Sequence, residues 1–406
     1  MDVGIAQFFG NDSILGNIIS FLFIFIMLFL YPKLMVSQMI ARMEQTAGML
    51  DDFTNTARRI VTRKITKTPT KEIRDSINSF LDFFVIEPVS LDPYGIMKKL
   101  EHLTTLSERR FKYFIKRVAP KQNQEDQANL LMGLSGAWSL NHITKIVKHY
   151  IGLVKKTKNL QLAMILQMQL PLIERVSKAL LKGTEALANG WPIGDAFGPM
   201  VATQLIGDSK VKAVDEDTVA VMKRVKGKTV YIVKARGPGG RLGRIGKVVD
   251  NYARRNKIAK IITVDAAAKL EGEKTGSIAE GIGVAIGGIG VERSYIENIS
   301  TQKDIPLDTY VVKMSSEEAI MPMKVEILNA VPSVVRLVEG NIAETREKGS
   351  IIVVGVGNTG GIGNNRKESD MAVPLIKANS KVLKSWEQEE EKKEKKWFNL
   401  GFMSQG

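Results

Sequence analysis

The chain has 406 residues, of which 44% are hydrophobic and 25% charged, so length and composition predict a mostly folded protein with more than one domain. No cysteine and only three histidines are present, which excludes disulfides, thiolate zinc sites, cysteine nucleophiles and a histidine metal cage. The net charge of +15 favours anionic partners, such as lipid headgroups, acidic substrates or nucleic acid. Nucleic acid is the least favoured, because no basic motif is interleaved with aromatic residues.

An uncharged run from Ser13 to Pro32 predicts a transmembrane helix in contact with the lipid bilayer. Twenty residues in a helix span about 30 Å, the thickness of a hydrocarbon core. Residues 1–12 carry two acids and no base, whereas seven basic residues lie between positions 33 and 67. The positive-inside bias therefore predicts a single-pass protein of the cell membrane, with a short extracytoplasmic N-terminus and the remaining chain in the cytoplasm. A cleaved signal peptide would start with basic residues, and this chain starts with acidic ones.

Residues 33–190 have the pattern of a cytoplasmic α-helical region, with apolar residues three or four positions apart, as in Ile73, Ile77 and Phe80. One uncharged stretch within it, residues 159–173, is 15 residues long. That is too short for a second span, and it predicts a buried helix of a bundle. The pair Asn189-Gly190 is typical of the end of a helix.

Residues 191–370 change to short apolar runs that alternate with helical patterns. The runs are Thr229–Ala235, Lys260–Ala266, Gly283–Gly288, Thr309–Met314 and Ile351–Gly357. Strands that alternate with helices predict an α/β domain with a mostly parallel sheet and helices on both faces. Residues 371–406 predict a C-terminal helix and a charged tail.

A glycine-rich loop follows the first of these strands and opens a helix. Its glycines, Gly239 and Gly240, allow backbone N–H groups to approach an anion, and four bases add positive charge: Arg236, Arg241, Arg244 and Lys247. The spacing is not that of a Walker A loop, because Val248 follows the lysine. The loop predicts a site for a phosphate or carboxylate, and the alternative is a surface turn whose arginines meet water or acidic neighbours.

Three carboxylates are candidates for chemistry. Asp265 lies at the carboxyl end of a predicted parallel strand, the edge at which open α/β sheets bind ligands. Asp195 lies between two glycines in the segment NGWPIGDAFGPMVA, and Glu280 follows in a glycine-rich stretch. Together, Asp195, Asp265 and Glu280 could hold a divalent metal, or the two aspartates could form an acid/base pair. The alternatives are that Asp265 caps the next helix and that Asp195 is a turn residue.

The segment IIVVGVGNTGGIGNN, residues 351–365, has the G-x-G-x-x-G spacing of a dinucleotide-binding turn at Gly355, Gly357 and Gly360. The dinucleotide fold needs a second strand with an acidic end about twenty residues later, and no such strand follows. We therefore expect no NAD. Gly355, Gly357, Asn358 and Gly360 stay candidates for contact with another ligand.

The chain as a whole resembles an archaeal family of unknown function, DUF1512, in the segments GWPIGDAFGP, VDAAAKLEGEKTGSIAEGIGVAIGG and VVGVGNTGGIGN. The C-terminal half more weakly resembles the spore germination proteases and hydrogenase-maturation peptidases, which share a phosphorylase/hydrolase-like α/β fold. Those families begin with a strand that ends in G-x-G-N and continue into a glycine-flanked aspartate. Here Asp195 is similar to that first aspartate and Asp265 to a second one.

The G-x-G-N strand comes last in this chain instead of first, which a circular permutation of the domain would explain. The loop from Gly355 to Asn365 would then lie beside Gly194–Pro199, at the same sheet edge as Asp265. The resemblance implies an aspartate- or metal-dependent hydrolase, peptidase-like, acting on a peptide or an anionic small molecule. Two alternatives come from other classes: a non-catalytic sensor of a phosphorylated molecule or nucleotide at Arg236–Lys247, and a membrane scaffold.

Overall fold

The computed structural model describes residues 14–83, 95–285 and 290–403. Contacts between Cα atoms divide the chain into two compact units. Unit 1 contains Met1–Asn55 and Leu140–Lys178, and unit 2 contains Thr56–Ser139 and Ala179–Gly406. Three long helices run from one unit into the other.

The N-terminal helix begins with α1 (Ile14–Phe25), passes through a π-helical turn (Ile26–Leu30) and continues as α2 (Tyr31–Ile65). Its large apolar side chains from Ile18 to Leu34 are exposed, as a segment in contact with lipid would be. Ile18–Ile65 is the one helix in the described part of the chain that is long and apolar enough to cross a membrane. The predicted extracytoplasmic residues 1–12 lie outside the described residues.

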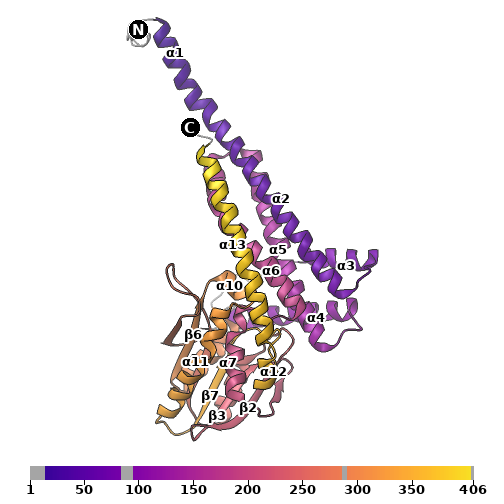
Figure 1. Ribbon diagram of the computed structural model, residues 1–406, viewed down its shortest axis with the longest axis vertical. Helices are drawn as coiled ribbons and strands as arrows, with labels where there is room; N and C mark the ends of the chain where they lie inside the picture. Colours follow the sequence, from indigo (N-terminus) through magenta and orange to yellow (C-terminus); the bar gives the residue numbers. More distant parts are fainter. Residues whose placement is uncertain (1–13, 84–94, 286–289, 404–406) are drawn as a thin grey trace. The chain divides into compact units, whose positions relative to one another are not determined.

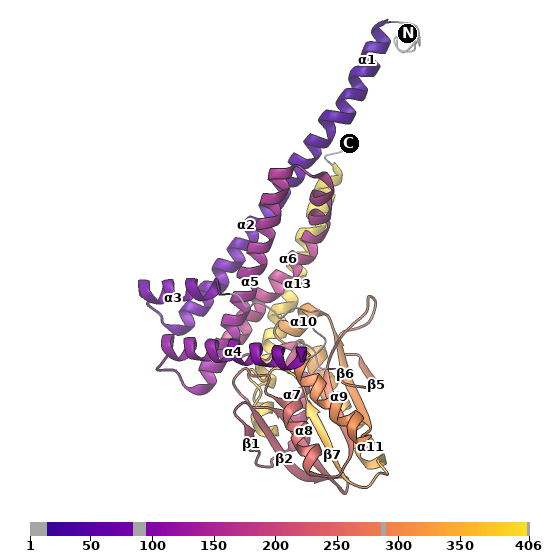
Figure 2. The same cartoon turned by 180° about the vertical axis from the view of Figure 1, so that it is seen from behind.

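In unit 1, α2 packs against parts of α5 (Gln124–Thr157) and α6 (Leu160–Asn189), and these helices run side by side in Figures 1 and 2. Their shared core includes Met43, Leu50 and Val154. Thr54 and Thr144 are joined by a buried hydrogen bond of 2.9 Å, and Glu44 forms an ion pair with Lys155. Because residue numbers rise along α2 as they fall along α5, the two helices are antiparallel.

The uncharged stretch 159–173 is only partly buried, which corrects the prediction of a buried helix. Ala163, Leu166 and Leu170 face the core of unit 1. Met164, Ile165 and Met168 on the same stretch are exposed. An apolar pattern on all sides of a helix cannot show which side the rest of the chain covers, and here one side is covered.

Unit 2 contains helices from the N-terminal half of the chain, including α3 (Lys71–Leu81) and α4 (Ile96–Val118). Phe80 of α3 joins them by packing against two rings of α4, with ring centroids 4.6 Å from Phe111 and 4.2 Å from Phe114. The side chain of Trp138 on α5 donates a hydrogen bond of 2.5 Å to the carbonyl oxygen of Phe83.

The α/β domain of unit 2 has a seven-stranded mixed sheet in the order β1-β2-β3-β7-β4-β6-β5. Its central strands β3, β7, β4 and β6 are parallel, and the pairs β1–β2, β2–β3 and β5–β6 are antiparallel. Most strands therefore point in one direction, as predicted. The strands are β1 (Lys212–Asp215), β2 (Thr218–Val225), β3 (Lys228–Ala235), β4 (Ile258–Ala268), β5 (Ile278–Ile282), β6 (Leu307–Met314) and β7 (Ser350–Gly355).

Helices cover both faces of the sheet, which confirms the predicted α/β class. Figure 1 shows α7 (Phe197–Ile206) and α11 (Val325–Glu344) over one face, and Figure 2 shows α8 (Ile245–Arg255) and α9 (Val291–Lys303) over the other. Alternate strand residues supply the two cores: Ile232 and Val353 pack on the first side, and Val233 and Ile352 on the second. The remaining helices are α10 (Ser316–Ile320), α12 (Arg366–Asp370) and α13 (Val373–Met403).

Four of the five predicted strands are present, and the fifth is misplaced. The prediction of a strand at Gly283–Gly288 is wrong for residues 283–285, and residues 286–288 lie outside the described residues. The strand is β5, which ends at Ile282 and is an edge strand. Edge strands are half-exposed and short, so they lack the continuous apolar run of a buried strand.

Candidate active site

The site is built where two central strands end at the same edge of the sheet. In β4 and β7, Val264 pairs with Gly355, and the N–H of Val356 donates a hydrogen bond of 2.9 Å to the carbonyl oxygen of Val264. Asp265 therefore lies beside the start of the loop that follows β7. The carboxyl edge of parallel strands is where α/β proteins bind ligands.

The start of α7 closes onto this edge because glycines allow backbone to meet backbone. A β-carbon at Gly198 would overlap the carbonyl oxygens of Val264 and Val356. One at Gly357 would overlap the carbonyl oxygen of Asp195, and the φ of +131° at Gly357 already favours glycine. These two contacts bring the segments GDAFGP and GVGNTGG together.

Asp195 is bound by the loop after β7. The backbone N–H of Asn358 donates a hydrogen bond of 2.8 Å to Oδ2 of Asp195, across 163 residues of sequence. The predicted position of the Gly355–Asn365 loop beside Gly194–Pro199 is therefore observed. Asp195 belongs to a single 3₁₀ turn (Gly194–Ala196) directly before α7. The residue is partly exposed, whereas its neighbours Gly194 and Ala196 are buried.

The two aspartates influence each other's ionisation. Burial raises the pKa of Asp195, and the N–H of Asn358 opposes that rise. Asp265 is 4% exposed, and burial raises its pKa well above the ordinary value. The negative charge of Asp195 raises the pKa of Asp265 further, against a hydrogen bond of 2.6 Å from the N–H of Ala266. Two carboxyl groups with such coupling can act as one acid and one base.

Glu280 is not a third member of this pair, which corrects the predicted metal site. In the sheet register, Asp265 pairs with Val311 and Glu280 pairs with Tyr310. Neighbouring residues of a strand point to opposite faces, so Glu280 lies on the other face of the sheet from Asp265. Glu280 is exposed and accepts a hydrogen bond of 3.3 Å from the hydroxyl of Tyr310. Among the described residues, no group of three or more His, Asp or Glu side chains could hold a metal ion.

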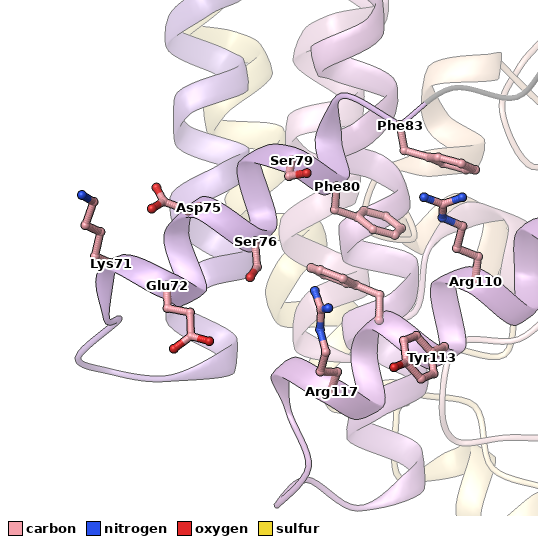
Figure 3. A pocket seen from close by; sticks show the side chains of 11 residues that line it. Lys71, Glu72, Asp75, Ser76, Ser79, Phe80, Phe83, Arg110, Tyr113 and Arg117 are labelled. Carbon is pink, nitrogen blue, oxygen red and sulfur yellow. The ribbon is translucent and has the colours of Figure 1, made fainter.

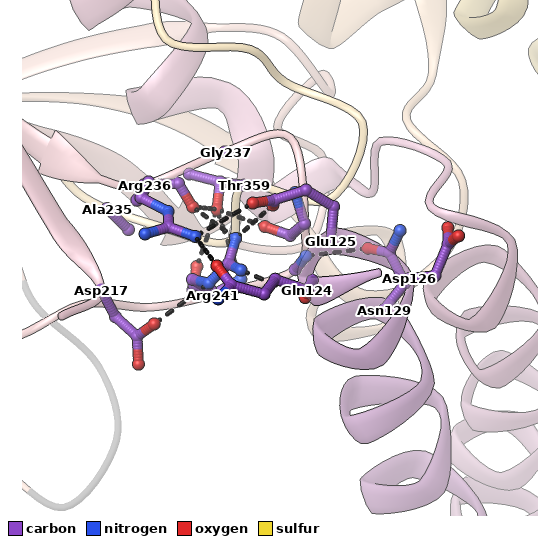
Figure 4. Close-up of polar contacts among 12 residues, drawn as sticks. Gln124, Glu125, Asp126, Asn129, Asp217, Ala235, Arg236, Gly237, Arg241 and Thr359 are labelled. Carbon is purple, nitrogen blue, oxygen red and sulfur yellow. Dashed lines mark hydrogen bonds and ion pairs between the residues drawn. The ribbon is translucent and has the colours of Figure 1, made fainter. Parts of the chain in front are cut away.

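The glycine-arginine loop after β3 already binds an anion, the carboxylate of Glu125 on α5 (Figure 4). Gly239 N–H donates to Glu125 at 2.7 Å, Arg236 donates at 3.1 Å, and Arg241 forms an ion pair with the same group. Arg241 also forms an ion pair of 3.0 Å with Asp217. Gly240 N–H donates to the side chain of Asn129.

The other predicted anion ligands of this loop have protein partners too. Arg244 lies 3.6 Å from Glu108, and Lys247 lies 3.6 Å from Glu101. The carboxylate of Glu292 accepts hydrogen bonds from the N–H groups of Gly246 and Lys247 at the start of α8. The alternative that the arginines of this loop meet acidic neighbours is therefore what the structure has, and an outside phosphate would have to displace acids of the same chain.

This cluster is linked to Asp195 through Thr359. Arg241 N–H donates to the Thr359 hydroxyl at 3.3 Å, and Thr359 N–H donates to the carbonyl oxygen of Arg241 at 3.1 Å. Asn358, which binds Asp195, directly precedes Thr359, and its side chain accepts a hydrogen bond of 2.8 Å from Gly360 N–H. Hydrogen bonds thus connect α5 to the candidate site.

We expect Glu125→Gln to lower the free energy of unfolding by about 1–2 kcal/mol, because Arg241 stays buried with one acid fewer. Burial alone would raise the pKa of Glu125, but hydrogen bonds from Arg241 and Gly239 outweigh it and hold the pKa below its ordinary value. The stabilisation is therefore present at neutral pH and lost as the pH falls through the lowered pKa. Urea unfolding at pH 7 measures it.

Asp126→Asn is the matched control, since it removes the same charge from the same helical turn. The described contacts of Asp126 are hydrogen bonds to Asn123 three residues away. We expect a change of less than about 0.5 kcal/mol for this variant. Equal losses in the two variants would contradict a specific role for Glu125.

Two family models match the chain. Residues 17–190 match the protein of unknown function (DUF1512) N-terminal domain, and residues 193–363 match the domain of unknown function (DUF1512) C-terminal. The chain belongs to the DUF1512 family. No curated protein and no solved structure matches it. The C-terminal DUF1512 model begins two residues before Asp195 and includes Asp265 and the Gly355–Gly363 loop.

Lys234 is a residue of the DUF1512 site region that sequence reasoning missed. It is fully buried in β3, pairs with Gly355 of β7, and donates hydrogen bonds to Ala235 O (2.8 Å) and Asn364 Oδ1 (3.3 Å). Burial lowers the pKa of Lys234 to about 7, against the charge of Glu368. The available signal was a lysine within the otherwise apolar run TVYIVKA.

An open groove of about 810 Å³ lies elsewhere in unit 2 of this DUF1512 chain, between α3 and α4. Phe80 and Phe83 are among its aromatic lining residues (Figure 3). The guanidinium of Arg110 stacks 4.3 Å from the centroid of Phe83. None of the lining residues belongs to the aspartate pair, so the groove adds nothing to the chemistry of that site.

Proposed function

We propose that the α/β domain is an aspartate-dependent hydrolase, peptidase-like in its chemistry, with Asp195 and Asp265 as its catalytic residues. The observation that carries this proposal is geometric: the loop after β7 binds Asp195 at the carboxyl edge of the sheet, where the neighbouring strand β4 places the buried Asp265. An enzyme gains little stability from placing two carboxyl groups where burial raises both pKa values. Strongly perturbed carboxyl groups at a ligand-binding edge are typical of catalytic sites.

The chemistry follows from the difference between the two groups. Asp265 has the larger rise in pKa and is the acid, and Asp195 is the base. Asp195 takes a proton from water as the water oxygen bonds to the scissile carbonyl carbon, and Asp265 gives its proton to the leaving nitrogen as the C–N bond breaks. A metal-dependent route has less support, because the described residues offer two carboxylates here and no third ligand side chain.

The strand order supports the resemblance to phosphorylase/hydrolase-like domains. The G-x-G-N strand β7 lies at the centre of the sheet, between β3 and β4, and both of these strands run parallel to it. A circular permutation of the domain would move such a central strand to the end of the chain, which is what the resemblance needs.

The N-terminal helix supports attachment to a membrane. In this proposal, residues 13–32 cross the bilayer, the N-terminus lies outside and the hydrolase domain is in the cytoplasm. The absence of charge over the span and the seven bases that follow it support this orientation. The sensor alternative is weakened because Glu125 and Glu292 take the donors of the loop that would bind a phosphate.

Turnover by the full-length chain in detergent tests the proposal. We expect hydrolysis of unstructured peptides from a panel that also contains small anionic amides, and we expect EDTA to leave the rate unchanged. Asp195→Asn should abolish turnover without lowering the unfolding temperature, because burial already disfavours the charged form of Asp195. No turnover of any member of the panel, or equal turnover by Asp195→Asn, would contradict the hydrolase.

A further inference from the structure

Unit 1 exposes an apolar face on the first half of α6. Met164, Ile165, Met168 and Leu172 are 53%, 56%, 71% and 47% exposed, and we call these four residues the α6 stripe. They recur at the three- and four-residue spacing that places side chains on one side of a helix. Contiguous exposed apolar side chains of this size mark interaction surfaces.

A second set of exposed apolar residues lies on the antiparallel neighbour α5. Ile146, Tyr150 and Leu153 are 47%, 43% and 37% exposed, and they alternate with Val147, Ile151 and Val154, which are buried in the core of unit 1. Each helix of the pair therefore has one apolar side inside unit 1 and another that faces out. The outward sides have the spacing of helices that pack against further helices.

The α6 stripe runs along the helix bundle and not along a membrane surface. The ion pair between Glu44 and Lys155 and the bond between Thr54 and Thr144 place the turn between α5 and α6 toward the start of α2. The stripe therefore begins near the apolar helix and runs away from it over about 12 Å, at 1.5 Å per residue. A bilayer surface would cover its first turn, whereas a helix alongside would cover all of it.

The stripe also carries no charge. No Asp, Glu, Lys or Arg occurs from Asn159 to Ile173. A two-fold axis brings the same patch of both copies together, so a patch with a net charge would repel its own copy. A neutral stripe satisfies this requirement, whereas a surface for an acidic or basic partner would carry the complementary charge.

We propose that the α6 stripe is the interface between two copies of this chain. The anchoring proposed above would hold both copies parallel in one membrane, so that equivalent stripes face each other at high effective concentration. The parallel arrangement of the two copies rests on the proposed anchoring. The argument from the neutral, helix-spaced surface does not depend on the anchoring. The interface goes beyond the hydrolase and does not depend on its activity.

The chain has no cysteine, so single cysteines report proximity without background. In membranes that contain the full-length chain, we expect a short bismaleimide to crosslink Met168→Cys into a dimer. Gln45→Cys is the control, because Gln45 is exposed on α2 of the same unit and lies away from its buried side. Crosslinking that is absent at position 168, or equal at both positions, would overturn the proposal.

A charge on the stripe provides the second test. Met168→Glu adds a carboxylate at an exposed helical position, so the monomer should stay folded while the two-fold axis brings like charges together. We expect light scattering of the detergent-solubilised chain to show a dimer in the wild type and at least about tenfold weaker association in Met168→Glu. Gln45→Glu adds the same charge to α2 and should leave the dimer intact. A wild-type monomer, or an equally stable dimer in Met168→Glu, would overturn the interface.

Discussion

Asp265→Asn should lower turnover by about 10²- to 10⁴-fold and make the protein increasingly more stable than wild type as the pH rises. The loss follows from removing the acid that protonates the leaving nitrogen. The gain follows because burial, with the charge of Asp195, raises the pKa of Asp265 in the folded state. The folded state therefore favours the neutral form of Asp265, and ionisation of Asp265 destabilises the folded state. Asparagine has a similar shape and does not ionise.

The pH dependence has a definite sign. A raised pKa contributes stability that is fully present below the pKa of the unfolded chain and is lost as the pH rises through the folded-state pKa. Wild type and Asp265→Asn should therefore have similar unfolding temperatures in acid and diverge as the pH rises, with the variant higher. Tryptophan fluorescence during thermal unfolding between pH 5 and 9 would measure this difference.

Asp308→Asn is a control with the opposite expectation. Asp308 lies on the neighbouring strand β6, and although burial alone would raise its pKa, hydrogen bonds from Lys260 and Asn341 hold it below the ordinary value. Asp308→Asn should destabilise the protein at neutral pH and leave turnover intact. A rate for Asp265→Asn equal to wild type, or a loss of stability at every pH, would contradict a catalytic role for Asp265.

The sequence was sufficient for the parts of the fold that are locally encoded. Buried parallel strands such as β4 and β7 are continuous apolar runs, and these were predicted within a few residues. Edge strands were not: β5 was placed too late in the chain, because it is short and half-exposed. The position of the loop after β7 beside Asp195 was predicted from the resemblance and not from periodicity.

Within the site, contacts carried by glycine could be predicted and contacts carried by distant charges could not. The approach of the Gly355–Asn365 loop to Asp195 was predicted from the resemblance and a circular permutation, and the glycines explain why the two backbones can meet so closely. The partner of Arg241 lies 116 residues earlier, on a helix whose acidic first turn looks like any other helix start. A sequence shows that an arginine needs an anion and does not show whether the chain supplies it. The same limit applies to Lys234, whose burial depends on three strands and a loop.

Gly357→Ala should cost about 3–5 kcal/mol of unfolding free energy and abolish turnover. The φ of +131° is strained for alanine, at roughly 1–3 kcal/mol. The new β-carbon would also overlap the carbonyl oxygen of Asp195 and lie 3.3 Å from Cδ of Pro199. Both neighbours are parts of the backbone or a ring, so the loop itself has to move. The hydrogen bond from Asn358 N–H to Asp195 is then lost, at about 1–3 kcal/mol for the buried groups left unpaired.

Gly283→Ala separates the two causes. Gly283 has a φ of +111°, and a β-carbon there would meet no atom of the described residues within 4 Å, so this variant has the backbone strain without the overlap. Urea unfolding should give a clearly larger loss for Gly357→Ala than for Gly283→Ala, and equal losses would contradict the tight approach of the two loops. Any turnover that survives in Gly357→Ala should need a higher pH than in wild type. The N–H of Asn358 opposes the rise in the pKa of Asp195, so without it the base stays protonated to a higher pH.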